Sequence, residues 1–572
     1  MAINGAQIAL ECLIREGVEV VFGYPGGANI PLYDALYNSP IRHILVRHEQ
    51  GAAFAAEGYA RASGRVGVCL ATSGPGATNL VTGIADAKLD GVPLVCITGQ
   101  VRRPVIGTDA FQETDVVGMT LPITKFNCVV MRTEELPQLF AQAFHIARTG
   151  RPGPVLIDIP VDVCREKLEH VEYLETVQVP GYSPAGESAQ GGKKEQAGKR
   201  NDQIEQVAAM LAEAKRPVVL VGAGAKWCGA TEAVRGLLDR LQMPAVQTVH
   251  GLGTIPEERP YYLGMVGMHG TRQSNLAVSH SDLLLVLGAR LDDRVTGDPT
   301  RFARGAKIVH FEIDPAQLHR VRTYEMPVIG DLAETVPELL SALPAPLPDW
   351  SGWLEETRAT PNPQTKENVA GGKPSPTRAL EMLFARMEPD AFMTADVGQH
   401  QMWAAQRASG LADPRQFITS GGLGAMGFAL PAAIGAQLAY PHRQVVCVAG
   451  DGGFQMNIQE LATIQRYSLP IKIMVIDNKY LGMVRQWQQL FWDRRYSEVD
   501  LYDNPDFVKI AEAYGIPGLL MNKGEDMERM LDEFLAMPGP ATLVVECPAE
   551  ANVYPMVPSG AALSEMILEE KK

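Results

Sequence analysis

Two short motifs in the last third of the chain carry side chains suited to holding a metal ion. Asp451 and Asn478 each follow closely behind an apolar run, at residues 444–449 and 471–476. Two strands that end in oxygen-bearing side chains can present both oxygens at one edge of a parallel sheet, where open α/β sheets bind ligands. Hard oxygen ligands with a single carboxylate suit Mg²⁺ that is shared with a phosphate group. The spacing therefore predicts a metal-anchored diphosphate.

The first third of the chain adds a glycine-rich loop and an isolated acidic residue. The loop at residues 73–79 follows an apolar run and opens a helix, so its backbone N–H groups could meet an anion or a polar ring. Alone, such a loop is more often only a tight turn, and a lone acid such as Glu49 is more often solvated. Whether the loop and Glu49 form part of a site depends on the strands and helices that position them.

The chain has 572 residues, too many for one hydrophobic core, and three domains are expected. Two segments rich in Gly, Pro and polar residues, 179–202 and 343–377, are predicted linkers between domains at 1–178, 203–342 and 378–572. Each domain alternates apolar strands with helices, which predicts three doubly wound parallel-sheet α/β domains. The expected strands are Val18–Phe22, Val66–Thr72, Leu94–Thr98, Val155–Ile159, Val218–Val221, Leu283–Leu287, Ile308–Ile313, Phe392–Ala395, Val445–Ala449, Ile471–Ile476 and Leu543–Cys547.

Composition excludes several classes of protein. The chain is 46% hydrophobic and 20% charged, as ordinary globular proteins are, and its net charge of −15 disfavours nucleic acid and membrane surfaces as partners. Its apolar runs are too short to span a membrane. The first 23 residues predict an amphipathic helix and a strand rather than a signal peptide. Eight cysteines without a Cys-x-x-Cys pair predict reduced, buried thiols and a cytoplasmic protein.

Several longer motifs follow in order along the chain. They are Tyr24–Gly27, Gly107–Glu113, Asp396–Trp403, Gly421–Phe428 and Leu481–Gln488. Together with Glu49, the 73–79 loop, Asp451 and Asn478, they resemble the thiamine-diphosphate-dependent enzymes. Within that superfamily the chain resembles the catalytic large subunit of acetohydroxyacid synthase (acetolactate synthase) of the biosynthetic bacterial type. The resemblance runs from about Gly5 to Met566 and is interrupted mainly at the two linkers.

The resemblance implies a carboligase that uses thiamine diphosphate, Mg²⁺ and a structural, non-redox FAD. Pyruvate would be decarboxylated, and the hydroxyethyl carbanion would attack pyruvate or 2-ketobutyrate to give 2-acetolactate or 2-aceto-2-hydroxybutyrate, for valine, leucine and isoleucine synthesis. Residues 1–178 would bind the pyrimidine, 203–342 the FAD, and 378–572 the diphosphate and metal. The active site would need two chains, so a homodimer or homotetramer is expected, with a small regulatory subunit as a further partner.

The resemblance also implies roles for individual residues. Glu49 would hydrogen-bond the pyrimidine ring from across the dimer interface, a contact that favours the tautomer in which a base lies beside thiazolium C2. Arg290 would receive the carboxylate of the second keto acid. The other pocket residues would be Phe111, Gln112, Met483 and Trp487. The metal ligands would be Asp451, Asn478 and the main-chain carbonyl of Tyr480.

Two further sets of residues are implied at the cofactors. Thiamine diphosphate would be contacted by Pro75, Asn79, Gln399, His400, Gly424, Met426, Gly452 and Gly453. FAD would be contacted by Arg151, Gly222, Gly224, Met268, His269, Gly270, Thr271, Arg290, Asp292, Glu312, Ile313 and Asp331. Three positions depart from the family pattern, which usually has Lys at Val161, His at Phe126 and Phe at Leu291, near the access channel or the flavin.

Three alternative functions stay open at this point. A flavin-dependent pyruvate oxidase uses the same scaffold, although Trp487 within its motif argues against it. Another thiamine-diphosphate lyase or transferase, such as a sulfoacetaldehyde acetyltransferase, is a more distant alternative. A catalytically silent paralogue would bind cofactors without turnover, whereas intact Glu49, Asp451 and Asn478 argue for activity.

Overall fold

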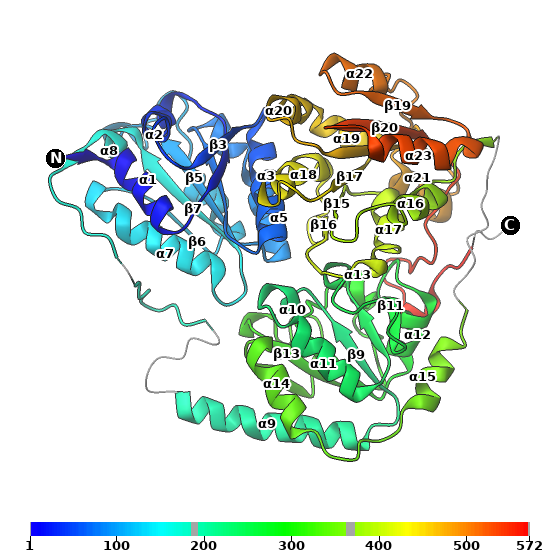
Figure 1. The fold of residues 1–572 in the computed structure, drawn as a ribbon. Helices are drawn as coiled ribbons and strands as arrows, with labels where there is room; N and C mark the ends of the chain where they lie inside the picture. The colour runs from blue at the N-terminus through cyan, green and yellow to red at the C-terminus, as the bar shows by residue number, and fades with distance from the viewer. Residues whose placement is uncertain (1, 175, 185–192, 362–371, 570–572) are drawn as a thin grey trace. The chain divides into compact units, whose positions relative to one another are not determined.

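The computed structural model describes residues 2–174, 176–184, 193–361 and 372–569 (Figure 1). These residues contain three six-stranded sheets with helices packed against them. The chain divides into two compact units. The first unit contains Met1–Tyr182, Ala391–His400 and Ile418–Cys547, and the second contains Ser183–Asp390, Gln401–Phe417 and Pro548–Lys572.

The N-terminal sheet belongs to the first unit and has the strand order β3-β2-β4-β5-β7-β6, all parallel. Every residue of its central strands is buried, so helices must cover both faces. The strands are β2 (Val20–Gly23), β3 (Arg42–Leu45), β4 (Gly67–Ala71), β5 (Leu94–Gln100), β6 (Phe126–Val129) and β7 (Pro154–Pro160). The helices are α1 (Gly5–Arg15), α2 (Ile30–Leu36), α3 (Glu49–Ser63), α4 (Pro75–Thr78), α5 (Val81–Asp90), α6 (Val116–Thr120), α7 (Leu136–Arg148) and α8 (Val161–Arg165). A short antiparallel pair, β1 (Ile3–Asn4) and β8 (Lys167–Leu168), lies beside them.

The C-terminal sheet has the order β16-β15-β17-β18-β20-β19. Strands β15, β17, β18, β20 and β19 pair in parallel. The strands are β15 (Phe392–Ala395), β16 (Phe417–Thr419), β17 (Val445–Gly450), β18 (Lys472–Asp477), β19 (Gly518–Met521) and β20 (Ala541–Glu546). The helices along this stretch of the chain are α16 (Pro376–Phe384), α17 (Gln399–Ala405), α18 (Ala429–Ala439), α19 (Asp451–Met456), α20 (Leu461–Arg466), α21 (Gly482–Phe491), α22 (Phe507–Ala513) and α23 (Met527–Ala536). Of these, α16 and most of α17 fall in the second unit.

Helices α3 and α18 pack closely against each other and join the two sheets of the first unit (Figure 1). Both helices are rich in Ala and Gly, which lets their backbones approach closely. A Cβ added at Gly435 would lie 1.9 Å from the carbonyl oxygen of Ala55, and one at Gly58 would lie 2.1 Å from that of Ala432. The small residues are therefore required by the packing.

The sheet of the second unit is also parallel, in the order β11-β10-β9-β12-β13-β14. The strand order reverses between β9 and β12, the type of position where doubly wound sheets bind ligands. The strands are β9 (Pro217–Val221), β10 (Ala245–Gln247), β11 (Tyr262–Met265), β12 (Leu283–Leu287), β13 (Lys307–Glu312) and β14 (Met326–Ile329). The helices are α9 (Lys193–Glu213), α10 (Gly224–Trp227), α11 (Thr231–Leu241), α12 (Arg272–His280), α13 (Asp293–Thr296), α14 (Leu332–Ala342) and α15 (Ser351–Arg358).

The structure confirms the predicted class of three doubly wound parallel-sheet domains. All eleven predicted strands are present, with ends within two residues of the expected positions. Nine strands of the described residues were not predicted. Two form the short pair β1 and β8, and seven belong to the six-stranded sheets, where six of them are edge strands: β3, β6, β11, β14, β16 and β19. An edge strand has one neighbour and needs fewer apolar residues, as the exposed Arg42 at the start of β3 illustrates. The seventh, β10, is three residues long.

Helices occupy parts of both segments predicted as linkers. Helix α9 begins at Lys193, inside 179–202, where residues 185–192 fall outside the described part of the chain. Helix α15 lies inside 343–377, and Trp350 at its N-cap and Trp353 within it are buried in the hydrophobic cores of the second unit. Among the residues that the structure describes, no helix combines the length and apolar character needed to cross a membrane.

Candidate functional site

The first cluster of predicted site residues lies at the start of helix α3. Glu49 is the first residue of the helix and is only 8% exposed. Its Oε2 accepts a hydrogen bond of 2.9 Å from Nδ2 of Asn79, at the end of the glycine-rich loop. A Cβ at Gly76 would lie 3.1 Å from Oε1 of Glu49. The turn between β4 and α4 thus brings the loop and the glutamate together, and it orients the carboxylate.

The loop after β5 reaches the same place. A Cβ added at Gly74, whose φ is +57°, would lie 2.8 Å from the carbonyl oxygen of Gln112. Gln112 itself has a φ of +59°, a conformation that non-glycine residues adopt rarely and that is often found at functional sites. Its neighbour Phe111 is 88% exposed. The glycine makes room for the strained loop, and a large aromatic ring is left uncovered by this chain.

The second cluster lies at the carboxyl ends of β17 and β18. These strands are neighbours, with Gly450 opposite Ile476, so Asp451 and Asp477 follow at the same edge of the sheet. Asp451 is 3% exposed, and its Oδ1 accepts from the N–H of Gly452 at 3.0 Å. Oδ1 of Asn478 accepts from the N–H of Tyr480 at 3.0 Å. The edge expected from the sequence therefore exists and carries both side chains.

The electrostatics of this edge favour a cation. Burial and the neighbouring Asp477 raise the pKa of Asp451 to about 8, since two carboxylates lie close together away from water. Nζ of Lys479 lies 2.6 Å from Oδ2 of Asp477 and partly compensates that group. A carboxylate and an amide oxygen form a donor set that suits Mg²⁺ with phosphate and water oxygens completing the shell. The described residues contain no group of three or more His, Cys, Asp or Glu that would hold a metal alone.

Asn504 is a site residue that the sequence did not reveal. Its Nδ2 donates to Oδ2 of Asp451 at 3.0 Å and lies 3.3 Å from Oδ1 of Asp477. Its Oδ1 accepts from Nε2 of Gln455 at 2.8 Å, which fixes the orientation of the amide. Asn504 lies in an irregular segment 53 residues after Asp451, so no local pattern could have identified it.

Gln399 and His400 lie beside the same edge. Nε2 of His400 accepts from the N–H of Gly450 at 3.1 Å, and burial lowers the pKa of His400 to about 3, so the ring is neutral. Oε1 of Gln399 accepts from Nδ2 of Asn478 at 3.3 Å, and its Nε2 donates to Gln486 at 2.9 Å. The structure thus brings both residues next to the predicted metal ligands.

The loop between β16 and α18 carries Gly424 and Met426. The methyl group of Met426 would lie 3.5 Å from a Cβ placed at Gly452, so this side chain reaches the Asp451 edge. The N–H of Gly427 donates to Oδ1 of Asp396 at 2.9 Å. Burial raises the pKa of Asp396 to about 6, and hydrogen bonds from the backbone oppose this shift. A Cβ at Gly453 would lie 3.0 Å from Cγ of Asp396, so a larger residue there would have to displace the Asp396 side chain slightly.

Helix α21 starts beside the edge that carries Asp451 and Asn478, and it contains Met483 and Trp487. A Cβ at Gly482 would lie 2.2 Å from Oε1 of Gln399. Met483 and Trp487 are four residues apart and share one face of the helix, both partly exposed. The ring of Trp487 packs edge-to-face against Phe491, with centroids 6.1 Å apart. The first residue of the helix therefore packs tightly against Gln399, and the following turn carries two large side chains.

The predicted FAD residues of the second unit lie along the carboxyl edge of its sheet. Gly222 and Gly224 follow β9, Arg290 and Asp292 follow β12, Glu312 ends β13, and Asp331 follows β14. This edge flanks the point where the strand order reverses, so its position fits a dinucleotide. The glycines also have a packing role, because a Cβ at Gly222 would lie 2.4 Å from Cα of Ala289.

Several of these residues make structural contacts. Oδ2 of Asp292 lies 2.6 Å from Nη2 of Arg290, and Oδ1 of Asp292 caps helix α13. The side chains of Asp331 and Thr271 cap α14 and α12 in the same way. Glu312 accepts from the N–H groups of Ile313 and Asp314. These contacts give each residue a structural role within the fold. The contacts of these residues with FAD remain predictions.

The segment with Met268, His269 and Gly270 packs against the C-terminal tail. The N–H of Val557 donates to the carbonyl oxygen of Met268 at 2.8 Å, and Nδ1 of His269 lies 3.2 Å from the carbonyl oxygen of Pro555. Burial lowers the pKa of His269 to about 4, so it is a neutral, buried ring.

The remaining predicted positions lie at the ends of elements. In the first unit, Nη2 of Arg151 donates to the carbonyl oxygen of Leu89 at 2.7 Å. Val161 begins α8 and Phe126 begins β6. Leu291 is 2% exposed in the core of the second unit.

Comparison with known proteins identifies the family. Residues 3–119 match "Thiamine pyrophosphate enzyme, N-terminal TPP binding domain", 204–339 match the central domain, and 396–545 match the C-terminal TPP binding domain. The chain is 48% identical to the acetolactate synthase isozyme 2 large subunit of Escherichia coli (strain K12), and the alignment covers 99% of each chain. It is 45% identical to the acetolactate synthase large subunit of Parasynechococcus marenigrum (strain WH8102), covering 99% of this chain and 91% of that one.

A third relative is similar over nearly the whole chain. The probable acetolactate synthase large subunit of Methanocaldococcus jannaschii is 44% identical, with 99% of this chain and 95% of that one covered. The similarity extends over all three sheets and includes the segments that form both clusters of the first unit. The chain therefore belongs to the acetolactate synthase large-subunit family of thiamine pyrophosphate enzymes.

Proposed function

We propose that this chain is the catalytic subunit of a thiamine-diphosphate-dependent carboligase that makes 2-acetolactate. Two molecules of pyruvate would yield one 2-acetolactate and one CO₂, and 2-ketobutyrate as acceptor would yield 2-aceto-2-hydroxybutyrate. The observation that carries the proposal is the pair Asp451 and Asn478 at one sheet edge, in a chain that matches large subunits over 99% of its length. The alternative functions have no comparable support.

Thiamine diphosphate, when bound, supplies the carbanion chemistry that decarboxylates a 2-keto acid. Glu49 would hold a proton in a hydrogen bond with pyrimidine N1′, a task suited to a buried carboxylate that Asn79 already orients. The carbonyl group of Gly424 would accept from the aminopyrimidine, and Met426 would pack against the rings. Gln399, His400, Gly452 and Gly453 would contact the diphosphate, and Pro75 would contact the pyrimidine.

A magnesium ion fits the edge formed by Asp451 and Asn478. A divalent cation would keep Asp451 ionised, which removes the cost of burying this carboxylate beside Asp477. The main-chain carbonyl of Tyr480 would supply a third protein ligand, and diphosphate oxygens would supply others. Asn504 would hold Asp451 in the orientation required for binding.

FAD would occupy the carboxyl edge of the second sheet as a structural group. The residues proposed to hold it are those of the 267–271 segment, the turns after β9 and β12, and the ends of β13 and β14. Arg290 would receive the carboxylate of the acceptor keto acid, which would compete with Asp292 for the guanidinium group. The three domains would then be 1–178 for the pyrimidine, 203–342 for FAD and 378–572 for the diphosphate and metal.

A second copy of the chain would complete each active site. The contacts of Glu49 and those of Asp451 form two separate clusters within one chain. Phe111 is 88% exposed and Leu121 is 67% exposed. Burial of these apolar side chains in a dimer interface would remove the free-energy cost of their contact with water. Phe111 and Gln112 would then line the pocket of the neighbouring chain, opposite Met483 and Trp487. A small regulatory subunit is a further proposed partner, because similar proteins are named large subunits.

The test is a product analysis under anaerobic conditions. The purified chain is supplied with thiamine diphosphate, Mg²⁺, FAD and pyruvate, and we expect one CO₂ and one 2-acetolactate for every two pyruvates consumed, with the flavin spectrum unchanged. Acetate formation with sustained FAD reduction would instead identify a pyruvate oxidase. Binding of the cofactors without any turnover would identify a silent paralogue. Equal amounts of pyruvate and 2-ketobutyrate in one reaction then give the acceptor preference.

A further inference from the structure

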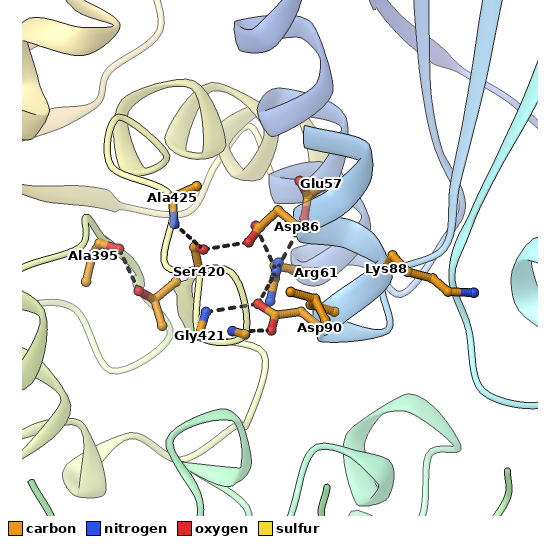
Figure 2. Close-up of polar contacts among 12 residues, drawn as sticks. Glu57, Arg61, Asp86, Lys88, Asp90, Ala395, Ser420, Gly421 and Ala425 are labelled. Atoms are coloured by element: carbon orange, nitrogen blue, oxygen red, sulfur yellow. Dashed lines mark hydrogen bonds and ion pairs between the residues drawn. The ribbon is translucent and has the colours of Figure 1, made fainter. Parts of the chain in front are cut away.

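A buried cluster of charged residues joins helices α3 and α5 to the loop that precedes α18 (Figure 2). Nη2 of Arg61 lies 2.8 Å from Asp90, 3.3 Å from Glu57 and 3.6 Å from Asp86. Arg61 is 3% exposed, Asp90 9%, and the other two are fully buried. Burying four charged groups is costly, and such clusters are weak contributors to stability. Their position therefore calls for a reason beyond packing.

The acidic residues of the cluster hold the backbone of the 420–427 loop. Oδ2 of Asp90 accepts from the N–H of Gly421 at 3.0 Å, and Oδ1 accepts from the N–H of Gly422 at 2.6 Å. One carboxylate thus binds two successive backbone N–H groups, and the Arg61 guanidinium holds that carboxylate from the other side, as Figure 2 shows. Two amides and one cation converge on Asp90.

A second connection runs through a hydroxyl group. The Oγ of Ser420 donates to Oδ1 of Asp86 at 2.5 Å and accepts from the N–H of Ala425 at 2.8 Å, which closes the loop on itself (Figure 2). Burial and Asp90 raise the pKa of Asp86 to about 7, and Arg61 and Ser420 oppose this shift. The side chain of Lys88, on the same helix as Asp86, points away from the cluster and donates to the carbonyl oxygen of Thr124.

The bonds enclose the two loop residues proposed to contact the cofactor. Gly421 and Gly422 precede Gly424, whose φ is +71°, and Ala425 separates it from Met426. Gly427 is held in turn by Asp396. Without these bonds a loop with four glycines between residues 421 and 427 would lose much of its preference for one conformation.

We propose that Asp90 and Asp86, fixed by Arg61, are positioning residues that hold the 420–427 loop in the conformation that presents Gly424 and Met426 to the cofactor. The inference rests on the proposed function, because the loop is assigned to thiamine diphosphate there. It adds a role for residues of helices α3 and α5, which belong to the N-terminal part of the first unit, in shaping a loop of the C-terminal part of the same unit.

The experiment compares Asp90→Asn and Ser420→Ala with the wild type and with Asp282→Asn. The control is matched, since Asp282 also accepts from two successive backbone N–H groups, those of Lys215 and Arg216, in the other unit. Two quantities are measured: amide hydrogen exchange in the peptide spanning 418–428, and the Kd of thiamine diphosphate with Mg²⁺ by isothermal titration calorimetry. Ser420→Ala changes no charge, so it tests the loop even where the Asp90 variant folds poorly.

We expect amide exchange in the loop to accelerate roughly tenfold in both variants, since each variant removes hydrogen bonds that hold the loop. The Kd of the cofactor should rise by a similar factor, while Asp282→Asn changes neither quantity. Unchanged exchange in both variants, or faster exchange with an unchanged Kd, would overturn the positioning role. A wild type that binds no thiamine diphosphate would overturn the proposed function, and the exchange data would still show whether the loop is held.

Discussion

The side-chain amide of Asn504 donates a hydrogen bond to Oδ2 of Asp451, with a distance of 3.0 Å. The contact joins an irregular segment to the first residue after β17 and orients a carboxylate that is otherwise next to another acid. Asn504 thus adds a side-chain contact at the proposed metal site to a segment whose backbone already pairs with residues 479–481.

Replacing Asn504 by Ala is expected to weaken magnesium binding. Partners that orient a metal ligand typically contribute 10–100-fold to affinity, so the Mg²⁺ concentration that half-saturates cofactor binding should rise about tenfold or more. The measurement is a Mg²⁺ titration of thiamine diphosphate binding followed by tryptophan fluorescence. Asn127→Ala, which removes a half-buried amide bonded to Val117 and Thr120, is the control and should leave the titration unchanged.

Glu49→Gln should abolish turnover while the cofactor still binds. The amide is nearly isosteric and can still meet Asn79, but it cannot hold the proton at the pyrimidine as a carboxylate does. We expect kcat to fall by about 10²–10⁴-fold. Glu16→Gln removes a half-buried carboxylate that is paired with Arg148 and should keep normal turnover. Substantial activity in Glu49→Gln would disprove the assigned role.

Gly435→Ala should destabilise the first unit although alanine is the better helix former. The new Cβ would lie 1.9 Å from the Ala55 carbonyl oxygen and 2.5 Å from the Tyr59 nitrogen, both backbone atoms of α3 that cannot move independently. Overpacking of this kind costs about 1–3 kcal/mol. In the control Gly236→Ala, on α11, the Cβ meets open space, so stability should rise by up to about 1 kcal/mol. The opposite shifts are read from thermal unfolding midpoints.

Asp158 should make stability fall as pH rises. Burial raises its pKa to about 7, although Thr98 and Gln100 donate hydrogen bonds to it. Between pH 4 and 7 the folded chain therefore holds a proton that the unfolded chain releases, and stability declines by up to about 1.4 kcal/mol per pH unit. Asp158→Asn removes this contribution. The free energy of unfolding of the wild type minus that of the variant should therefore fall as pH rises from 4 to 7.

Asp162 is the control, because its pKa is shifted in the opposite direction to that of Asp158. Although burial opposes the shift, hydrogen bonds and the charge of Arg103 lower the pKa of Asp162, so its contribution is lost as pH falls. Urea unfolding midpoints of Asp158→Asn, Asp162→Asn and wild type, measured from about pH 2 to 8, cover both effects, since the contribution of Asp162 is lost below its usual pKa and that of Asp158 changes between pH 4 and 7. A pH-independent difference between wild type and Asp158→Asn would contradict the raised pKa.

The central strands and the family motifs could be read from the sequence because their signals are local. Strands such as β12 and β17 are continuous apolar runs, and Asp451 and Asn478 stand directly behind two of them. Edge strands such as β3 carry no such signal, because a strand with one neighbour and an exposed face tolerates Arg and His. The three-domain α/β fold was therefore predictable, and its sheet edges were not.

The fold class, the family and the residues that follow the central strands can be predicted from local patterns in the sequence. Which distant groups act on those residues depends on the packing: Asn504 bonds Asp451, Asn79 bonds Glu49, and Asp90 bonds the 421–422 amides. Asp90 and Gly421 are 331 residues apart. A hydrogen bond between groups so far apart depends on how sheets and helices pack, and no periodicity or local propensity records that packing.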